Sequence, residues 1–87
     1  MPKVVFAHAV SDRAHWASKH SERVDAFASW GSNVVDYLSA DGSNNVAVSV
    51  DVHDIAAMQA ALSSPEIEAA KKAHGVVEPI TLLIEKS

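Results

Sequence analysis

The alternation of side chains in residues 46–53 (VAVSVDVH) is the feature that most constrains the fold of this chain. A valine at every second position is typical of a β-strand with one buried face. Residues 40–45 (ADGSNN) are rich in turn-forming residues, and residues 33–39 (NVVDYLS) before them are again strand-like. The two strands are therefore expected to form a hairpin, which places an antiparallel sheet at the centre of the fold.

Two further strands and two helical regions complete the predicted order. Residues 3–10 (KVVFAHAV) and 79–86 (PITLLIEK) are strand-like. A helix is predicted over residues 13–30, beginning after Asp12 as N-cap and ending at Gly31, which can take the left-handed cap conformation.

The second helical region is predicted in two segments, residues 55–62 and 65–74. Asp54 and Ser64 are the expected N-caps, and Pro65 fits the first turn of a new helix but not a helix interior. Gly75 is expected to close the second segment. The order β-α-β-β-α-β predicts a single α+β domain over residues 1–87 with a four-stranded antiparallel sheet.

Composition excludes several classes of function. The chain contains no cysteine, so disulfides, cysteine-ligated metal sites and thiol nucleophiles are excluded. Its net charge is −4 with only seven lysines and arginines, which argues against nucleic-acid or anionic-membrane partners. No apolar run approaches the roughly 20 residues of a membrane span, and the N-terminus lacks the pattern of a secretory signal. A cytoplasmic location is the resulting expectation.

One face of the predicted sheet has no helix to cover it, because both crossovers place their helices on the same side. Alternation assigns large residues to the helix side, whereas the other side carries mostly small ones. A second copy could approach this second side closely, so we predict a homodimer with two stacked sheets. The alternative is a monomer with a lightly apolar solvated face. The helix-side set is Val4, Phe6, His8, Val10, Val46, Val48, Val50, Val52, Ile80, Leu82 and Ile84, and the other is Val5, Ala7, Ala9, Ala47, Ser49, Asp51, His53, Thr81, Leu83 and Glu85.

Polar residues interrupt the buried faces near one point. On the first helix, Trp16, Arg23 and Phe27 fall within one stripe and His20 flanks it. His8 points toward the same stripe from the sheet, next to Phe6. An apolar space holding a few polar groups is the usual form of a small-molecule site.

Each of these residues also has a structural interpretation. The two histidines can be satisfied by neighbouring polar groups or solvent, and Arg23 can cover apolar surface while its head stays wet. Trp16 and Phe27 can be core residues. Tyr37 either donates its hydroxyl into the cavity or is buried at a sheet edge, and Asp51 is better suited to a hydrogen bond across a dimer than to catalysis.

Other kinds of chemistry find little support in the sequence. The five histidines show no His-x3-His pair on a helix, so no metal site is predicted. No Gly-x-Ser-x-Gly elbow and no glycine-rich phosphate loop occur. Acid–base chemistry by histidine remains, because its reference pKa of about 6.5 suits proton transfer near neutrality.

With these features the chain resembles the dimeric α/β-barrel superfamily of ferredoxin-like domains. The resemblance covers nearly the whole chain and rests on the element order and on local features: His8-Ala9-Val10 with Asp12, Trp16 and Phe27, Asp54-Ile55, and Ser64-Pro65-Glu66. Members include cofactor-independent antibiotic-biosynthesis monooxygenases, heme-degrading monooxygenases, polyketide cyclases, muconolactone isomerases and stress-responsive barrel proteins. Fold alone does not choose between these activities.

The resemblance to heme-degrading members implies a polar pocket residue on the first strand, a place that His8 occupies. Those members also carry an axial histidine in the second helical region, where the only candidate is His74, at the extreme end of the helix. We therefore predict no cofactor.

Two functional hypotheses follow. In the first, the pocket binds a small hydrophobic or aromatic molecule, with His8 as acid/base or orienting donor, His20 as its partner and Arg23 as anchor for a ligand carboxylate; Phe6, Trp16, Phe27 and Tyr37 line it. Turnover would be a cofactor-free oxygenation, isomerisation or cyclisation. In the second, the protein is a non-catalytic binding or stress-associated assembly protein with structural histidines. A cavity of about 300 Å³ or more favours the first.

Overall fold

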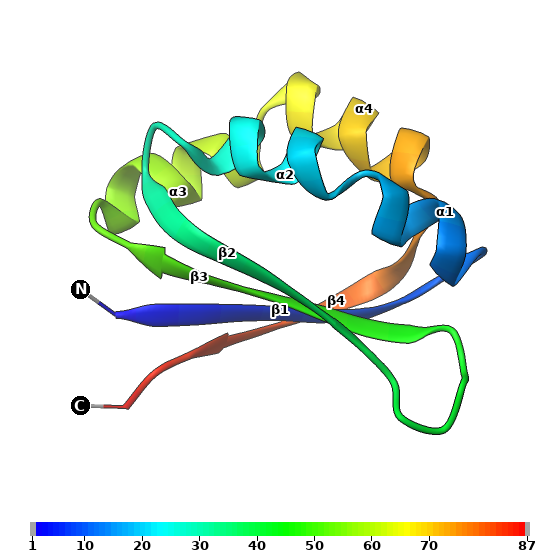
Figure 1. Cartoon of the computed structure of the whole chain (residues 1–87). Coiled ribbons are helices and arrows are strands. Elements are labelled where there is room, and N and C mark those ends of the chain that lie inside the picture. Colours follow the sequence, from blue (N-terminus) through cyan, green and yellow to red (C-terminus); the bar gives the residue numbers. More distant parts are fainter. Residues whose placement is uncertain (1, 87) are drawn as a thin grey trace.

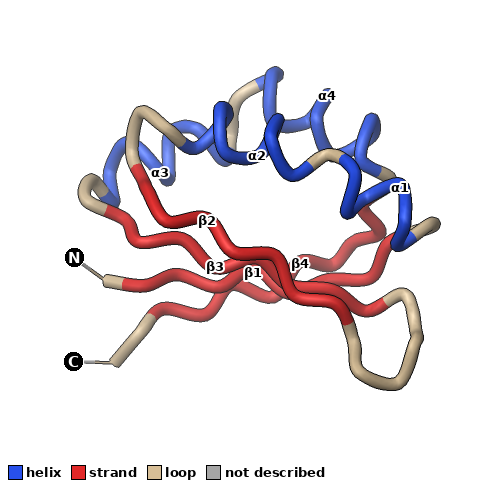
Figure 2. Tube along the Cα trace, in the orientation of Figure 1, coloured by secondary structure: helices blue, strands red, loops and turns tan. Residues whose placement is uncertain are grey.

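A computed structural model describes residues 2–86 as two layers, a four-stranded sheet and a layer of helices that covers one of its faces (Figure 1). The strands are all antiparallel in the order β2-β3-β1-β4, so β1 and β3 are central. Figure 2 shows the helices on one side of the sheet only. The predicted α+β class, the strand pairing and the bare sheet face are confirmed. In chain order the elements are β1 (Lys3–Val10), α1 (Arg13–Ser18), α2 (His20–Phe27), β2 (Gly31–Leu38), β3 (Asn45–Val52), α3 (Ile55–Leu62), α4 (Pro65–His74) and β4 (Val76–Ile84).

The predicted helix caps are confirmed at three positions. The side chain of Asp12 accepts from two backbone N–H groups of α1, and that of Asp54 accepts from the N–H of Ala57 in α3. Ser64 caps α4 in the same way. At the other end of α4, Gly75 takes the left-handed conformation with φ of 75°.

The first helical region is not continuous, contrary to prediction. It breaks at Lys19, whose φ and ψ of −96° and 13° leave the helical range. Ser18 just before the break donates its hydroxyl to the carbonyl of His15 at 2.6 Å, a local bond that competes with helical hydrogen bonding. The break leaves the carbonyl of Trp16 outside the regular helical ladder, where it accepts from Lys19 N–H at 3.1 Å.

Gly31 does not act as the helix cap that the sequence predicts. It is the first residue of β2, which starts two residues earlier than expected. A Cβ atom at this position would lie 2.6 Å from Cγ2 of Val50 on β3. Glycine is therefore required for close approach of the two strands rather than for a left-handed turn.

β4 departs from the predicted strand at its start. It begins at Val76 rather than at residue 79 and contains a bulge. Ala7 pairs with Thr81 and Ala9 pairs with Val77. The interval of four residues on β4 is therefore opposite an interval of two residues on β1. The bulge lies opposite His8, and it brings Ile80 against the core.

The core lies between the helices and the sheet, as alternation predicts for β1 and β3. On β4 only one of the three expected helix-side residues packs against the core: Ile80 does, whereas Leu82 and Ile84 are 43% and 52% exposed. They pair with Phe6 and Val4 and so share the helix-side face, but β4 is an edge strand that the helices do not fully cover. The buried apolar residues are Val4, Phe6, Val10, Trp16, Phe27, Trp30, Val46, Val48, Val50, Val52 and Met58.

Candidate functional site

A cavity of about 90 Å³, partly open to solvent, lies between the sheet and the helices. Five of the seven predicted site residues line it: Phe6, His8, Trp16, Arg23 and Phe27. The opposite wall comes from α3, α4 and β4, which the sequence analysis did not assign to the site. That wall consists of Leu62, Ile67, Ala70, Lys71, His74, Val76 and Ile80, and Ala26 and Val48 complete the lining.

His8 presents a hydrogen-bond acceptor in this cavity. Its Nδ1 lies 2.9 Å from the carbonyl oxygen of Ala9, and a carbonyl can only accept, so Nδ1 carries the proton. Nε2 then carries the lone pair in the neutral ring. The ring stands edge-on to Trp16, with centroids 6.0 Å apart. Burial lowers the pKa of His8, the Arg23 charge lowers it further, and the Ala9 carbonyl opposes both. His8 is therefore a neutral proton acceptor at pH 7.

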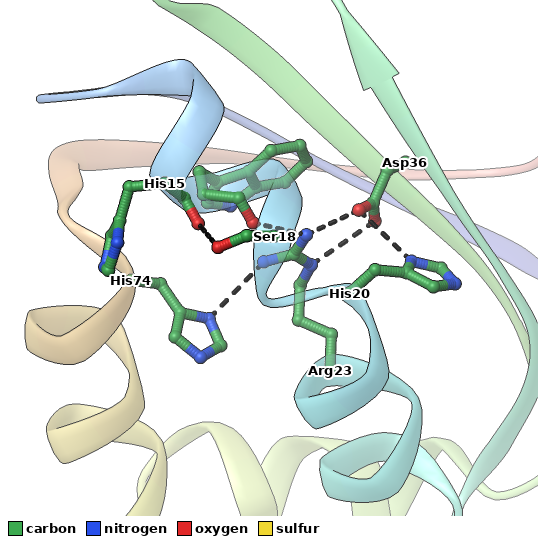
Figure 3. A network of polar contacts seen from close by, with 7 residues as sticks. His15, Ser18, His20, Arg23, Asp36 and His74 are labelled. Carbon is green, nitrogen blue, oxygen red and sulfur yellow. Dashed lines mark hydrogen bonds and ion pairs between the residues drawn. The ribbon is translucent and has the colours of Figure 1, made fainter.

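Arg23 is buried. This contradicts the structural interpretation from the sequence, in which its guanidinium group stays in contact with solvent. Its guanidinium group lies over the ring of Trp16, with Cζ 3.9 Å from the ring centroid. Nε donates to Oδ1 of Asp36 at 3.3 Å and Nη2 donates to Oδ2 of the same carboxylate. Nη2 also donates to the Trp16 carbonyl at 2.8 Å, the group left outside the helical ladder by the break at Lys19. Figure 3 shows how this network surrounds the guanidinium.

Asp36 thus occupies the place on Arg23 where the sequence analysis expected a ligand carboxylate. A guanidinium group has five N–H donors, and four of them have acceptors here: two on Asp36, one on Trp16 and one on Nδ1 of His74 at 3.4 Å. One N–H of Nη1 has no acceptor within residues 2–86. Arg23 can therefore donate one hydrogen bond to a ligand but cannot bind a ligand carboxylate in a bidentate manner.

His74 is the second histidine of the cavity, and the sequence analysis did not predict it there. It is 6% exposed, and its Nδ1 accepts from Arg23 while Nε2 lies 3.9 Å from a carboxylate oxygen of Glu22. Burial lowers the pKa of His74, and the Arg23 charge adds to this effect. The spacing of Ile67, Ala70 and His74 along one helical face could have identified it.

His20 and Tyr37 lie outside this cavity. Nδ1 of His20 is 3.1 Å from Oδ2 of Asp36, the same oxygen that accepts from Nη2 of Arg23 (Figure 3). His20 therefore meets Asp36 rather than His8. Tyr37 pairs with Ala47 on the helix-free face, where its hydroxyl hydrogen-bonds to Ser49 Oγ at 3.0 Å. Alternation along β2 could have found Asp36, because it shares the helix side with Val34.

The surroundings of His74 do not favour an axial heme ligand. Its Nδ1 accepts from Arg23, so in the neutral ring the proton lies on Nε2, the nitrogen that would otherwise hold the iron. Within residues 2–86, no three histidine, aspartate or glutamate side chains are grouped so that they could hold a metal ion. No helix in the same part of the chain has the length and apolar character needed to cross a membrane.

The lowered pKa values of His8 and His74 predict a loss of stability in mild acid. The unfolded chain takes up protons as the pH falls below about 6.5, whereas the folded protein resists protonation until a lower pH. The free energy of unfolding should therefore fall as the pH drops through 6.5 and level off below the pKa values of the folded state. Urea titrations between pH 7.5 and 5 measure this slope.

The variant H8Q should show a shallower slope over the same interval, because one of the two groups is removed. H53Q, which changes an exposed histidine at the end of β3, is the matched control. The lowered pKa values of Glu22, Asp41 and Asp51, caused chiefly by side-chain hydrogen bonds, act at lower pH. A wild-type slope in H8Q would contradict the burial argument for His8.

Comparison with solved structures finds the same fold in antibiotic-biosynthesis monooxygenases. SnoaB, a cofactor-independent oxygenase from Streptomyces nogalater, superposes with a TM-score of 0.74 at 16% identity, covering 99% of this chain and 93% of that one. An antibiotic biosynthesis monooxygenase superposes at 0.69 with 10% identity, covering 100% and 98%. Rv0793 from Mycobacterium tuberculosis superposes at 0.65 with 15% identity, covering 100% and 95%.

These similarities confirm the ferredoxin-like fold that the resemblance noted from the sequence implies. The sequence matches no protein-family model and no curated protein. At identities this low the likeness establishes the fold, and the function must be argued from the site.

Proposed function

We propose that the cavity binds a small hydrophobic or aromatic molecule and that His8 takes a proton from it. The observation that carries this proposal is the hydrogen bond from Nδ1 of His8 to the Ala9 carbonyl, which leaves the Nε2 lone pair for the ligand. A neutral imidazole near physiological pH is an effective general base. The remaining N–H of Arg23 Nη1 would stabilise negative charge that develops on the ligand.

This pairing suits reactions that begin with proton removal next to a carbonyl group. The proton moves to Nε2 of His8, giving imidazolium, and the electron pair of the broken bond delocalises onto the ligand oxygen. Oxygenation without a cofactor, isomerisation and cyclisation can all begin with this step. SnoaB, a cofactor-independent oxygenase with this fold, lends support to oxygenation. His20 would act only indirectly, through Asp36 and Arg23.

Deuterium exchange tests the assignment of His8. Wild-type protein in D₂O should accelerate exchange of the methyl protons of acetophenone, a small aromatic ketone, followed by proton NMR. H8Q should lose about 10²-fold or more of this acceleration, the usual contribution of a positioned general base. Because burial lowers the pKa of His8, the acceleration should persist below pH 6.5 and then fall with the basic form.

The exposed His53 offers the control for the same assay, because H53Q changes a histidine that does not line the cavity. H53Q should exchange like wild type. Exchange that is equally fast in H8Q and wild type would remove the catalytic role of His8.

The size of the cavity favours the second hypothesis, a non-catalytic binding or assembly protein. A volume of about 90 Å³ is well below the roughly 300 Å³ at which ligand pockets begin. His8 and His74 would then be core residues satisfied by Ala9 and Arg23. Native mass spectrometry of the purified protein tests ligand binding: a retained small molecule supports a binding site, catalytic or not, whereas a bare assembly supports an assembly protein.

We also propose that the helix-free face binds a second copy of the chain. Its exposed apolar residues include Val77 and Leu83, at 46% and 54% exposure, and between them lie small residues such as Ala7 and Ala9. Small side chains permit close packing of two sheets, and a two-fold arrangement matches the face with itself. Tyr37 and Ser49, whose hydroxyl groups are hydrogen-bonded on this face, would supply polar contacts across such an interface.

Replacing Ala7 by glutamate should therefore dissociate the protein. Wild type is expected at twice the 9.2 kDa chain mass by analytical ultracentrifugation at micromolar concentration, and A7E at the single mass. Two carboxylates buried in a stacked interface would lack partners. A56E places the same change on an exposed position of α3 and should leave the mass unchanged. Wild type sedimenting at the single mass would rule out the dimer.

A further inference from the structure

The positive charges that line the cavity are already matched by carboxylates of the protein. Lys71 lies 3.0 Å from Glu68 and 3.1 Å from Glu78. Arg23 is held at two points by Asp36, with side chains only 6% and 17% exposed. The two histidines have lowered pKa values and add no charge at pH 7. The wall around a ligand is therefore close to neutral.

Asp36 and Trp16 together prevent Arg23 from turning toward another anion. The carboxylate takes both the Nε and Nη2 edges of the guanidinium, and the Trp16 ring covers one of its faces. The Trp16 carbonyl holds the same Nη2 at 2.8 Å. A ligand carboxylate would have to displace Asp36 or be buried beside it, and either event sets two carboxylates against one guanidinium, with His20 Nδ1, 3.1 Å from Asp36, as the neighbouring basic group.

We propose that Asp36 makes the cavity selective for the charge of its ligand. The cavity binds a neutral molecule with a carbonyl or hydroxyl oxygen and rejects a carboxylate. The inference rests on the proposed function, since it specifies the ligand of the same cavity. It replaces the ligand carboxylate expected from the sequence with an internal one. The ligand oxygen accepts the single remaining N–H of Arg23 Nη1. Asp36 itself does not line the cavity, so it acts through Arg23 as a specificity-determining residue.

Benzamide and benzoate test this proposal because they have the same shape and differ in charge at pH 7. Ligand-observed NMR titration should show wild type binding benzamide at least tenfold more tightly than benzoate. In D36N, which removes the charge and keeps the shape, Arg23 lacks its counter-ion and should accept benzoate. The preference should therefore reverse in D36N.

The control variant is D51N, which removes a carboxylate paired with Lys3 at 3.3 Å on the helix-free face. D51N should keep the wild-type preference.

Thermal unfolding keeps the test decisive if D36N is poorly folded. Any ligand that binds the folded state alone raises the unfolding temperature. Benzoate should stabilise D36N more than benzamide does, and the order should be the opposite for wild type. If D36N binds with the wild-type preference, or if neither compound stabilises it, the role of Asp36 is overturned, whereas the proposed ligand-binding function is not. Failure of both compounds to bind wild type would instead overturn the proposed ligand-binding function, and the role of Asp36 with it.

Discussion

Replacing Asp36 by alanine is expected to lower the free energy of unfolding by about 3–5 kcal/mol, one of the largest effects of any single change in this chain. The variant leaves the charge of Arg23 buried without a counter-ion, because the guanidinium is only 6% exposed. Two of the four N–H donors of Arg23 that have acceptors would also lose them, which adds to the loss of stability. Urea denaturation at pH 7 measures the change, and a domain this small has little stability to spare.

The double variant R23M/D36L separates the cost of a stranded charge from the value of the pair. Replacing both partners of a buried ion pair with apolar residues is often neutral. The double variant should therefore be more stable than D36A, although it loses the contact of Arg23 with the Trp16 carbonyl. A D36A variant within about 1 kcal/mol of wild type would show that the pair is accessible to solvent, against its burial in the structure.

Replacing Trp16 by alanine is the second change with a large expected effect, about 3–5 kcal/mol of lost stability. The indole is 1% exposed and packs between the sheet and the helices. Its removal leaves a void next to the existing cavity and takes the ring away from both Arg23 and His8. Chemical denaturation gives the loss, and W16F, which keeps most of the volume, should lose less.

The same variant reports on the cavity. If W16A folds, its enlarged cavity should bind a ring-sized neutral ligand such as benzamide more tightly than the wild-type cavity does, because the ligand fills the void. Equal stability of W16A and wild type would contradict the assignment of Trp16 to the core.

Much of the fold follows from local patterns in the chain. Alternating valines in residues 46–53 and the Asp41-Gly42 turn before them predict the β2–β3 hairpin, since these signals depend only on near neighbours. The caps at Asp12, Asp54 and Ser64 are equally local. No such local signal marks the break at Lys19, because the core-facing stripe of Trp16, Arg23 and Phe27 continues across it.

The candidate site was predicted only in part. The stripe on the first helical region identified three lining residues, and Phe6 and His8 on the first strand make five, because period and alternation say which side chains face the core. Neither pattern says which polar groups meet there. Whether His8 faces His20 or His74 depends on how α2 and α4 pack, and that is a long-range property.

The sequence by itself determined the order of the strands and helical regions, the helix caps at Asp12, Asp54 and Ser64, the composition of the two sheet faces and the presence of buried polar residues. Only the tertiary structure decided the partners of the buried charge: Asp36 for Arg23 and Arg23 for His74. The reason is physical. Backbone propensity and periodicity act over a few residues, whereas a buried charge is matched by whichever group the packing of distant elements brings within hydrogen-bonding distance.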